Sequence, residues 1–441
     1  MSDKYDLDYF DSSEYRRRQP NRRRNAYNRT AYNKKVYRSG RCAPSRRPSN
    51  STRNTRRPSK TNYYKRLKNR IIIITVGILI LIALIAIIVS TFNACAKISN
   101  ADQNTVTTTE ESTVPTTEEP VPTMDPTDPL NPGYFIPPQI QDNGTVGFSN
   151  YNAYIWNKTA YELFGDIDGR AKIYADSINN YKKNLGDDVT VYNMVIPNHT
   201  EMELPDRIKA NGFSDSQATS IKNIYSMLDR SVIPINAYNK LSQHNNEYIY
   251  FDSDHHWTAL GAYYAYTAFA ERTEQPVLDL KTCAENKIEG FSGSFANTNE
   301  GMLNVDTVSY YTFPYNVTMD ITDESGTTNT YDSPYYPFAE AGPHTYGVFI
   351  IGDNPLTVLK SDSEKGTGKK IAVIKESYGN AFVPFLTYNY EEVHVIDFRY
   401  FNSNLKTYCT ENGIDEVLYM NGVMSASTQI QIDSMDSLFT N

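Results

Sequence analysis

An uninterrupted apolar segment in the first quarter of the chain is the feature that most restricts its architecture. Residues 71–92 contain no charged side chain and consist mostly of Ile, Leu, Val and Ala. About 20 apolar residues in a helix can cross the roughly 30 Å hydrocarbon core of a bilayer. Several basic residues lie at 65–70, whereas Lys97 is the only basic residue soon after the segment. The positive-inside rule therefore predicts a type II signal anchor in the cell membrane, with the C-terminal part outside the cell.

The segment before this expected helix is strongly basic and has no hydrophobic period. Residues 1–70 carry 22 Lys and Arg against 5 Asp and Glu, whereas the rest of the chain carries 21 basic and 46 acidic residues. Low hydrophobicity and high net charge are typical of disorder. A basic arm of this kind can bind nucleic acid, but a cytoplasmic tail that orients the membrane helix and touches anionic lipid fits its position better.

The segment after the expected helix has the composition of a spacer. Residues 93–133 are rich in Thr, Glu and Pro, and such a sequence cannot bury a core. We expect an extended stalk that holds a folded domain of residues 134–441 away from the membrane. The acidic charge of that domain argues against nucleic acid as its partner.

Strand and helix patterns alternate through the expected domain. Apolar runs predict strands at 189–198, 231–235, 247–251, 369–375, 392–397 and 415–421. Helical patterns lie between them at 215–229, 257–272, 380–386 and 403–411. This alternation predicts an α/β fold with a parallel central sheet covered on both faces. Residues 285–350 break the rhythm and are expected to form a β-rich insertion.

Cysteine usage excludes two classes of small domain. Four cysteines in 441 residues cannot form a disulfide framework, and no Cys-x-x-Cys pair is present for a zinc ribbon. A disulfide between Cys283 and Cys409 stays open, because the sequence gives no geometry for it.

A cluster of carboxylates and imidazoles follows the expected strand at 247–251. The sequence at 252–257 reads DSDHHW. Such a run can bind a metal ion through Asp254, His255 and His256. It can also supply a general base and the carboxylate that orients it. A third interpretation is that Asp254 only caps a helix that begins at Trp257. We favour acid–base chemistry without a cofactor, because the other histidines are isolated in the sequence.

A serine follows another expected strand at the same edge of the sheet. Ser377 lies at the turn between the strand 369–375 and the helix 380–386. In an open α/β sheet, sites form at the carboxyl ends of the strands. A serine nucleophile needs a base within hydrogen-bond reach, and His256 oriented by Asp254 can provide it.

The same edge holds the candidate groups for an oxyanion or a substrate. The N-terminus of the helix after Ser377 can offer backbone N–H groups, which makes Tyr378 and Gly379 candidates. Asn421 ends the last strand and can donate a side-chain amide, although Asn-Gly is also a common turn pair. Arg399 can hold a substrate or form a structural salt bridge, and Trp257 is a further candidate for contact with an oxyanion or a substrate.

The string Asp254-His255-His256-Trp257 resembles the signature of the DHHW family of bacterial membrane-anchored proteins. Their domain is similar to that of the alginate O-acetyltransferases, which have an SGNH-hydrolase-like fold. The motif Asp-x-His-Trp, followed later by a serine at a strand end, maps onto Asp254, His256, Trp257 and Ser377. The resemblance covers about residues 145–441. It implies a three-layer sandwich and a Ser-His-Asp triad that moves an acetyl group through an acyl-enzyme.

The chain also departs from the pattern of the family that it resembles. The spacing Asp252-x-x-His255 fits ordinary SGNH hydrolases, so this pair is an alternative to Asp254 and His256. The serine follows Lys-Glu rather than Gly-Asp, and Gly379 is the candidate for the glycine donor. Asn421 matches the asparagine donor only by its position at a strand end.

Together these features predict an O-acetyltransferase for a cell-envelope or exopolysaccharide. An acetylesterase of the same fold, a non-catalytic glycan-binding protein and a metal-dependent hydrolase are the alternatives. The chain has no multi-pass segment to import acyl groups, so a transferase needs a separate membrane protein as acetyl donor. The 35 tyrosines suit a sugar substrate, since aromatic rings stack on sugar faces. The acidic domain favours a neutral or aminosugar polymer.

Overall fold

The computed structural model describes residues 131–440, except for 152, 211–213, 337–338 and 340. The expected basic tail at 1–70, the expected membrane helix at 71–92 and all but the end of the expected stalk at 93–133 lie outside the described residues. Within the described part of the chain, no helix has the length and apolar character needed to span a bilayer.

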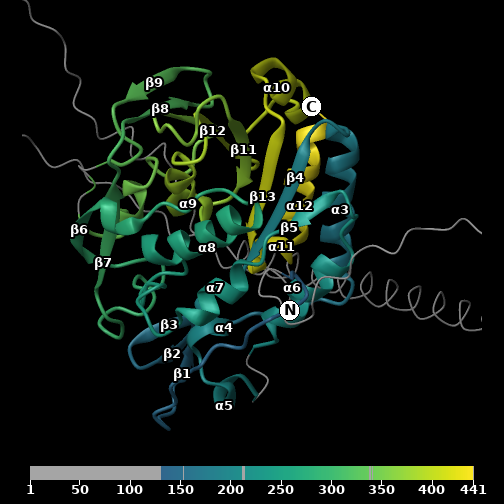
Figure 1. Cartoon of the computed structure of the whole chain (residues 1–441). Helices are drawn as coiled ribbons and strands as arrows, with labels where there is room; N and C mark the ends of the chain where they lie inside the picture. Colours follow the sequence, from purple (N-terminus) through teal and green to yellow (C-terminus); the bar gives the residue numbers. More distant parts are fainter. Residues whose placement is uncertain (1–130, 152, 211–213, 337–338, 340, 441) are drawn as a thin grey trace, which may run out of the picture. The chain divides into compact units, whose positions relative to one another are not determined.

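A mixed eight-stranded sheet forms the centre of the domain (Figure 1). Its first five strands run parallel to one another, and the last three are antiparallel to their neighbours. In spatial order the strands are β5 (Val232–Pro234), β4 (Thr190–Ile196), β13 (Glu416–Gly422), β11 (Lys370–Lys375), β12 (Glu392–Asp397), β10 (Leu356–Ser361), β8 (Val317–Thr322) and β9 (Thr328–Tyr331). The central strands are rich in buried Val, Ile and Leu, as expected for parallel strands covered on both faces.

Helices pack on both faces of this sheet (Figure 1). In one group, α3 (Arg170–Leu185) contacts α6 (Gln217–Ser226), α10 (Leu405–Asn412) and α12 (Gln429–Asp436). In the other group, α8 (Ala259–Arg272) contacts α7 (Ala237–Gln243) and α9 (Gly379–Leu386). Shorter helices are α4 (His199–Glu203), α5 (Asp206–Ile208) and α11 (Val423–Ala426), and 3₁₀ turns cover 280–282, 345–348 and 437–439. The helix α3 was not predicted from the sequence, although its buried residues Tyr174, Ile178, Tyr181 and Leu185 recur at helical spacing.

The predicted strand at 247–251 is wrong. Its last three residues, 249–251, are buried, but the segment lies outside the sheet and forms an isolated bridge with the residues just after it. The N–H of Phe251 donates to the carbonyl of His256, and that of Thr258 donates to Ile249. An apolar run shows that a segment is buried, but it does not reveal whether its backbone partners belong to a sheet or to its own loop.

The segment 285–350 divides between two sheets. The strands β6 (Ala284–Phe291) and β7 (Asp306–Thr312) form a separate two-stranded sheet, whereas β8 and β9 extend the central sheet through β10. A third sheet, which the sequence did not predict, contains β1 (Phe148–Asn150), β2 (Ala153–Trp156) and β3 (Thr159–Glu162).

Cys283 and Cys409 are both free thiols. The disulfide that the sequence left open between them is therefore absent. Cys409 is buried on α10, and burial raises the pKa of its thiol to about 12, which keeps it protonated and unreactive at neutral pH.

Candidate active site

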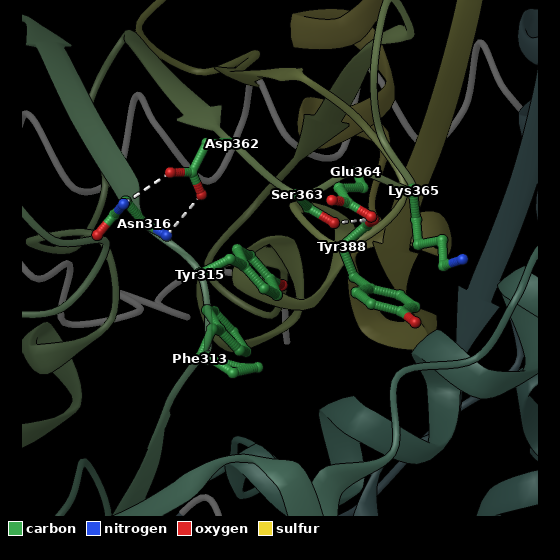
Figure 2. A pocket seen from close by; sticks show the side chains of 9 residues that line it. Phe313, Tyr315, Asn316, Asp362, Ser363, Glu364, Lys365 and Tyr388 are labelled. Carbon is green, nitrogen blue, oxygen red and sulfur yellow. Dashed lines mark hydrogen bonds between the residues drawn. The ribbon is translucent and has the colours of Figure 1, made fainter.

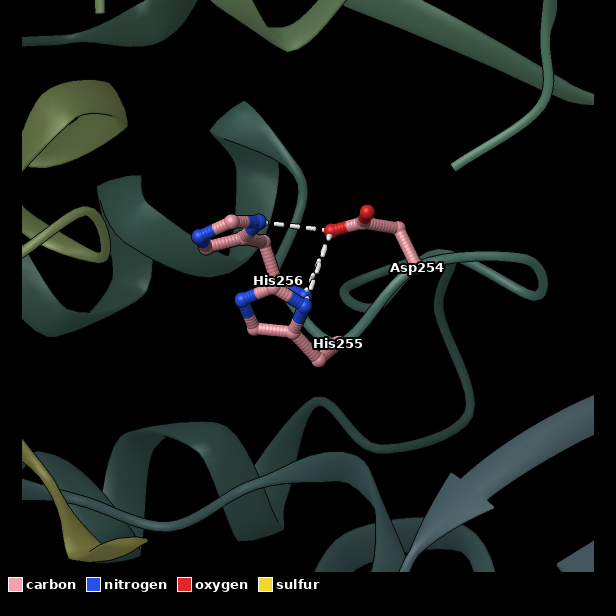
Figure 3. Close-up of side chains that lie close together, drawn as sticks. All are labelled: Asp254, His255 and His256. Carbon is pink, nitrogen blue, oxygen red and sulfur yellow. Dashed lines mark hydrogen bonds and ion pairs between the residues drawn. The ribbon is translucent and has the colours of Figure 1, made fainter. Parts of the chain in front are cut away.

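Two segments far apart in the chain meet at the carboxyl edge of the parallel strands. The first is the loop 252–257 before α8, and the second is the turn that joins β11 to α9. The loop folds back on itself through the backbone bonds described above and carries Asp254, His255 and His256 (Figure 3). Asp254 does not cap α8, because Thr258 occupies that position and its side chain accepts from the N–H of Gly261.

A continuous chain of hydrogen bonds joins Asp254, His256 and Ser377. Asp254 Oδ1 lies 2.6 Å from His256 Nδ1, and His256 Nε2 lies 2.7 Å from Ser377 Oγ. A carboxylate can only accept, so the proton of the neutral ring lies on Nδ1 and Nε2 accepts from the serine hydroxyl. The structure thus brings together the three residues that the sequence singled out as nucleophile, base and orienting acid.

The surroundings of Asp254 keep it ionised. Its carboxylate accepts from the backbone N–H of His256 at 2.9 Å and from that of Ser294 at 2.8 Å. Burial alone would raise the pKa of Asp254, but the rings of His256 and His255 and these hydrogen bonds hold it well below its usual range. Gly293 allows this close approach, because a Cβ there would lie 2.3 Å from the Cβ of Asp254.

Aromatic side chains fix the orientation of the base and the serine turn. The ring of Tyr346 stacks on His256, with centroids 4.0 Å apart and an interplanar angle of 9°. The Tyr346 hydroxyl also donates to the carbonyl of Ser377 at 3.2 Å. Trp257 donates from Nε1 to the carbonyl of Tyr378 at 3.0 Å, and the Tyr378 hydroxyl donates to the carbonyl of His255. Trp257 is fully buried, so it joins the two segments rather than lining a substrate site.

The three predicted oxyanion donors are already engaged. The N–H of Tyr378 donates to Glu376 Oε2 at 3.0 Å, and the N–H of Gly379 donates to the Glu376 carbonyl at 2.9 Å. Asn421 is buried; it accepts from the hydroxyl of Tyr174 at 2.7 Å and contacts Ser425 at 3.5 Å. The structure therefore does not point any of these groups freely at Ser377.

The alternative pair of Asp252 and His255 is not assembled. Asp252 accepts from Thr159 Oγ1 at 2.5 Å and from Asn304 Nδ2 at 2.9 Å. His255 instead has its Nδ1 2.8 Å from Ser294 Oγ. Burial and then the nearby His256 ring lower the pKa of His255, which favours its neutral form.

Arg399 forms structural salt bridges, which is one of the two roles that the sequence left open for it. Its guanidinium forms two bonds to Asp397, at 2.7 and 2.6 Å, and one ion pair with Asp353 at 2.7 Å. Lys375, at the end of β11, pairs with the same two carboxylates at 3.0 and 3.1 Å. These four side chains form a buried ionic cluster below the serine turn, so Arg399 is not available to a substrate.

Asp254, His255 and His256 also have a geometry that a metal ion can use. One ligand atom from each lies within 4.8 Å of the others (Figure 3). However, Asp254 Oδ1 and His256 Nδ1 bond to each other, and His256 Nε2 contacts Ser377. Metal binding would break the bond to the serine or the bond to the acid, so these residues fit proton transfer better than a metal.

Four residues at the site escaped the sequence analysis. Tyr346 and Ser294 come from the segment between β6 and β10, which has no motif around them. Glu376 precedes the serine and accepts from Gly422 N at 2.8 Å. Glu162 ends β3, and burial raises the pKa of its carboxyl, which interacts with the charges of His255 and Asp254. Only the position of Glu376 beside Ser377 offered a sequence signal.

Comparisons with known proteins agree on the fold. A crystal structure of a DHHW family protein from Eubacterium siraeum is 30% identical, with a TM-score of 0.60, covering 67% of this chain and all of that chain. Bacillus cereus PatB1 with a sulfonyl adduct is 18% identical, with a TM-score of 0.54, covering 65% of this chain and 99% of that one. PatB1 without the adduct gives a TM-score of 0.52 at the same identity, covering 65% of this chain and 98% of that one. No curated protein matches the sequence.

The family signature and the fold thus point to one group. The family model described as DHHW protein matches residues 137–396, which include Asp254, His256 and Ser377. This match spans more than half of the chain and agrees with the crystal structure that the chain covers completely. The chain belongs to the DHHW protein family.

Proposed function

We propose that this protein is a membrane-anchored extracytoplasmic serine enzyme that transfers acetyl groups to a cell-envelope or exopolysaccharide. Ser377 acts as nucleophile, His256 as general base and Asp254 as the residue that orients the base, on an SGNH-hydrolase-like fold. The observation that carries this proposal is the chain of two short hydrogen bonds from Asp254 through His256 to Ser377. The resemblance to the alginate O-acetyltransferases favours acetyl as the transferred group.

The geometry supports a two-step reaction. Ser377 Oγ attacks the carbonyl carbon of an acetyl donor while its proton moves to His256 Nε2. Asp254 stabilises the resulting imidazolium through the bond to Nδ1. The tetrahedral intermediate then releases the leaving group, which takes the proton from Nε2, and acetyl-Ser377 remains. In the second step a sugar hydroxyl gives its proton to Nε2 and attacks the ester, and the departing Ser377 Oγ takes that proton from Nε2, which regenerates the serine.

The backbone N–H of Ser377 itself is the best candidate for an oxyanion donor. Within the described residues it makes no hydrogen bond, in contrast to the N–H groups of Tyr378 and Gly379. In an acyl-serine the oxygen of the tetrahedral intermediate lies close to the N–H of the serine that carries it. We therefore propose this donor in place of the N–H groups of Tyr378 and Gly379 and the amide of Asn421.

The acceptor decides between transfer and hydrolysis. An acetylesterase would form the same acetyl-Ser377 and pass it to water. We propose transfer, with a multi-pass membrane protein that delivers the acetyl group and a polysaccharide hydroxyl that receives it. The expected anchor at 71–92 would hold the enzyme next to such a donor.

The test is trapping of the acyl-enzyme. We expect the full chain, kept in solution by a mild detergent, to gain one acetyl mass from an aryl acetate and one sulfonyl mass from a sulfonyl fluoride. The sulfonyl reagent is chosen because PatB1, which shares the fold, is described with a sulfonyl adduct. Ser377→Ala should remove both adducts, since no other hydroxyl contacts His256 Nε2 among the described residues.

Ser226→Ala is the matched control, because Ser226 is exposed on α6 and distant in sequence from both segments of the site. This variant should keep both adducts. A folded wild-type protein that gains no adduct from either reagent would favour the non-catalytic glycan-binding alternative. Adduct formation that survives a metal chelator would exclude the metal-dependent alternative.

A further inference from the structure

The surface of the domain carries a groove with aromatic walls (Figure 2). It has a volume of about 660 Å³, which is within the range of ~300–1,000 Å³ typical of small-ligand sites. Its walls come from the turn before β8, the turn after β10 and the end of the helix α9. Phe313, Tyr315 and Tyr388 supply the aromatic surface, and Asp362, Glu364 and Lys365 supply the charges.

The groove and Ser377 lie at opposite ends of α9. Ser377 lies two residues before the helix, which spans Gly379–Leu386, whereas Tyr388 lies two residues after it. Eight helical residues extend over about 12 Å. Asp362 follows the end of β10, which runs antiparallel to β12, so the groove lies at the edge of the sheet where the parallel strands begin. It is therefore separate from the site at their carboxyl ends.

The aromatic side chains present a platform. The rings of Phe313 and Tyr315 stack with centroids 5.2 Å apart and an interplanar angle of 3°. The ring of Tyr388 lies 6.1 Å from Tyr315 at 34°. Tyr315 and Tyr388 are half-buried, so part of each side chain is accessible to solvent, while the buried Phe313 packs against Tyr315.

Hydrogen bonds hold the walls of the groove in place. Asp362 accepts from the backbone N–H of Asn316 at 2.7 Å and from its Nδ2 at 2.6 Å. Ser363 Oγ donates to the carbonyl of Tyr388 at 2.8 Å, and the hydroxyl of Tyr315 lies 3.2 Å from Thr387 Oγ1. Because these bonds join the three wall segments, a ligand would lose little free energy to ordering them.

The rim offers exposed donors and acceptors. Glu364 and Lys365 are exposed, and neither side chain makes a hydrogen bond or ion pair within the described residues. A carboxylate and an ammonium group beside accessible aromatic faces suit a ligand that has many hydroxyls and a flat C–H surface. β-Linked hexopyranoses have such surfaces, since the C–H bonds of the ring point to its two faces. The groove is open to solvent, which allows a long chain to enter and leave.

We infer that this groove binds a segment of a β-linked polysaccharide and so holds the polymer on the domain at a distance from Ser377. The inference goes beyond the proposed function, because binding here requires no chemistry at the serine. If both hold, the groove raises the local concentration of acceptor chains around the active site.

The test measures co-sedimentation of the full chain, in mild detergent, with insoluble chitin and cellulose particles. About 0.5 M salt suppresses attraction through the basic segment 1–70, because charges are then screened within a few ångströms. Wild type should bind at least one of the two polymers. Tyr315→Leu and Tyr388→Leu, which keep an apolar side chain but lose the ring, should weaken binding roughly three- to tenfold.

Three further variants make the result specific. Tyr388→Phe keeps the ring and should bind like wild type, and so should Tyr151→Ala, which removes an exposed tyrosine elsewhere. Ser377→Ala should also bind normally while it loses the acyl adduct, so the two proposals can fail separately. Thermal melting confirms that the Leu variants fold; if one does not, Glu364→Ala with Lys365→Ala replaces it, and the same weakening is expected.

Two results would overturn the inference. One is a wild-type protein that binds neither polymer. The other is binding that Ser377→Ala weakens and the groove variants leave unchanged, which would place the glycan at the active site instead.

Discussion

Glu376 occupies an unusual position for a carboxylate, directly beside the proposed nucleophile. It is buried, and its oxygens accept from the N–H of Tyr378 at 3.0 Å and from that of Gly422 at 2.8 Å. The Ser377 hydroxyl lies 3.3 Å from the same side chain, compared with 2.7 Å from His256. Glu376 thus ties the serine turn to the end of β13 and offers the hydroxyl a second, weaker acceptor.

We expect Glu376→Gln to act as a positioning variant. The amide keeps the size of the side chain but replaces one acceptor with a donor, which then faces a backbone N–H. Loss of one buried hydrogen bond costs ~1–3 kcal/mol. The rate of acyl-enzyme formation should therefore fall by roughly 10- to 100-fold, with little change in KM. Stopped-flow release of nitrophenol from an aryl acetate measures this, and Glu364→Gln, on the exposed rim of the groove, is the control. Unchanged acylation in Glu376→Gln would contradict this role.

We expect the buried His199 to make the free energy of unfolding depend on pH. The ring is fully buried, and neither nitrogen has a hydrogen-bond partner in the described part of the chain. Burial, followed by the charge of His255, lowers the pKa of His199 to about 3. Between pH 3 and 6.5 the unfolded chain therefore binds a proton that the folded chain does not, so stability falls as the pH falls. At pH 5 the loss from this residue is about 2 kcal/mol relative to neutral pH.

His199→Phe should flatten that dependence. The ring lies 4.9 Å from Tyr161 and stacks with Phe295, so phenylalanine fits the same aromatic surroundings. Urea unfolding at pH 7 and pH 5 should show a smaller difference for the variant than for wild type. Equal differences in the two proteins would show that His199 does not titrate in this way.

At this scale the sequence revealed the residues of the proposed reaction but not their supports. Asp254 and His256 belong to a rare cluster, and Ser377 lies where a strand passes into a helix. Ser294 and Tyr346 act through a backbone N–H and a ring face, which many residues can offer, so no sequence pattern marks them. The engaged state of Asn421 likewise depends on Tyr174, 247 positions away.

The segment between α8 and β10 shapes the loop that carries the base. Asp306 at the start of β7 accepts from the backbone N–H groups of Asp252 and Ser253, at 2.9 and 2.8 Å. Ser294 donates to Asp254, and Gly293 lies against the same side chain. The β-rich segment is therefore part of the site rather than an addition at the surface.

Gly293→Ala tests this contribution. The added Cβ would lie 2.3 Å from the Cβ and 2.6 Å from Oδ2 of Asp254, so the carboxylate must shift. We expect acylation to fall at least about tenfold, because a misplaced acid no longer orients His256. Thermal melting should show a fold that persists. Gly301→Ala is the matched control, since its Cβ would meet no atom within 4 Å, although its positive φ of 71° makes it strained. Equal acylation in both variants would argue against the role of the segment.

Most strands of the parallel sheet were predictable because each has a short, mostly apolar and buried centre, and helices separate one strand from the next. The segments with which each strand pairs were less predictable than the positions of the strands. The end of the run at 247–251 is buried like a strand but bonds to its own loop. The strand β8 joins the central sheet through β10, which runs antiparallel to it. The pairing of strands depends on residues that are distant in sequence, and the local hydrophobic periodicity does not predict which strands will pair.

A buried ionic cluster connects three segments of the whole domain. Lys375 and Arg399 share Asp353 and Asp397, and all four side chains are nearly inaccessible. Removing one partner leaves uncompensated charge in the interior, which typically costs ~3–5 kcal/mol. We therefore expect Arg399→Ala to lower the free energy of unfolding by about that amount, as measured in urea.

Lys172→Ala provides the comparison at the surface. Its partner Asp176 lies 2.6 Å away, but both side chains are more than half exposed, so the change should stay within ~0.5 kcal/mol. Similar losses for both variants would mean that the buried cluster has no special weight in the stability of the domain.

The position of β13 between β4 and β11 has a consequence for how the chain acquires its shape during synthesis. β13 is the last strand in sequence order, yet it joins the first parallel strand of the chain to the strand that leads into Ser377. The ribosome synthesises β4 about 225 residues before β13, so β4 cannot pair with β13 until the end of synthesis. Contacts between residues so distant in sequence form slowly. Until β13 has been synthesised, the central sheet that supports the loop with His256 and the turn with Ser377 is therefore incomplete.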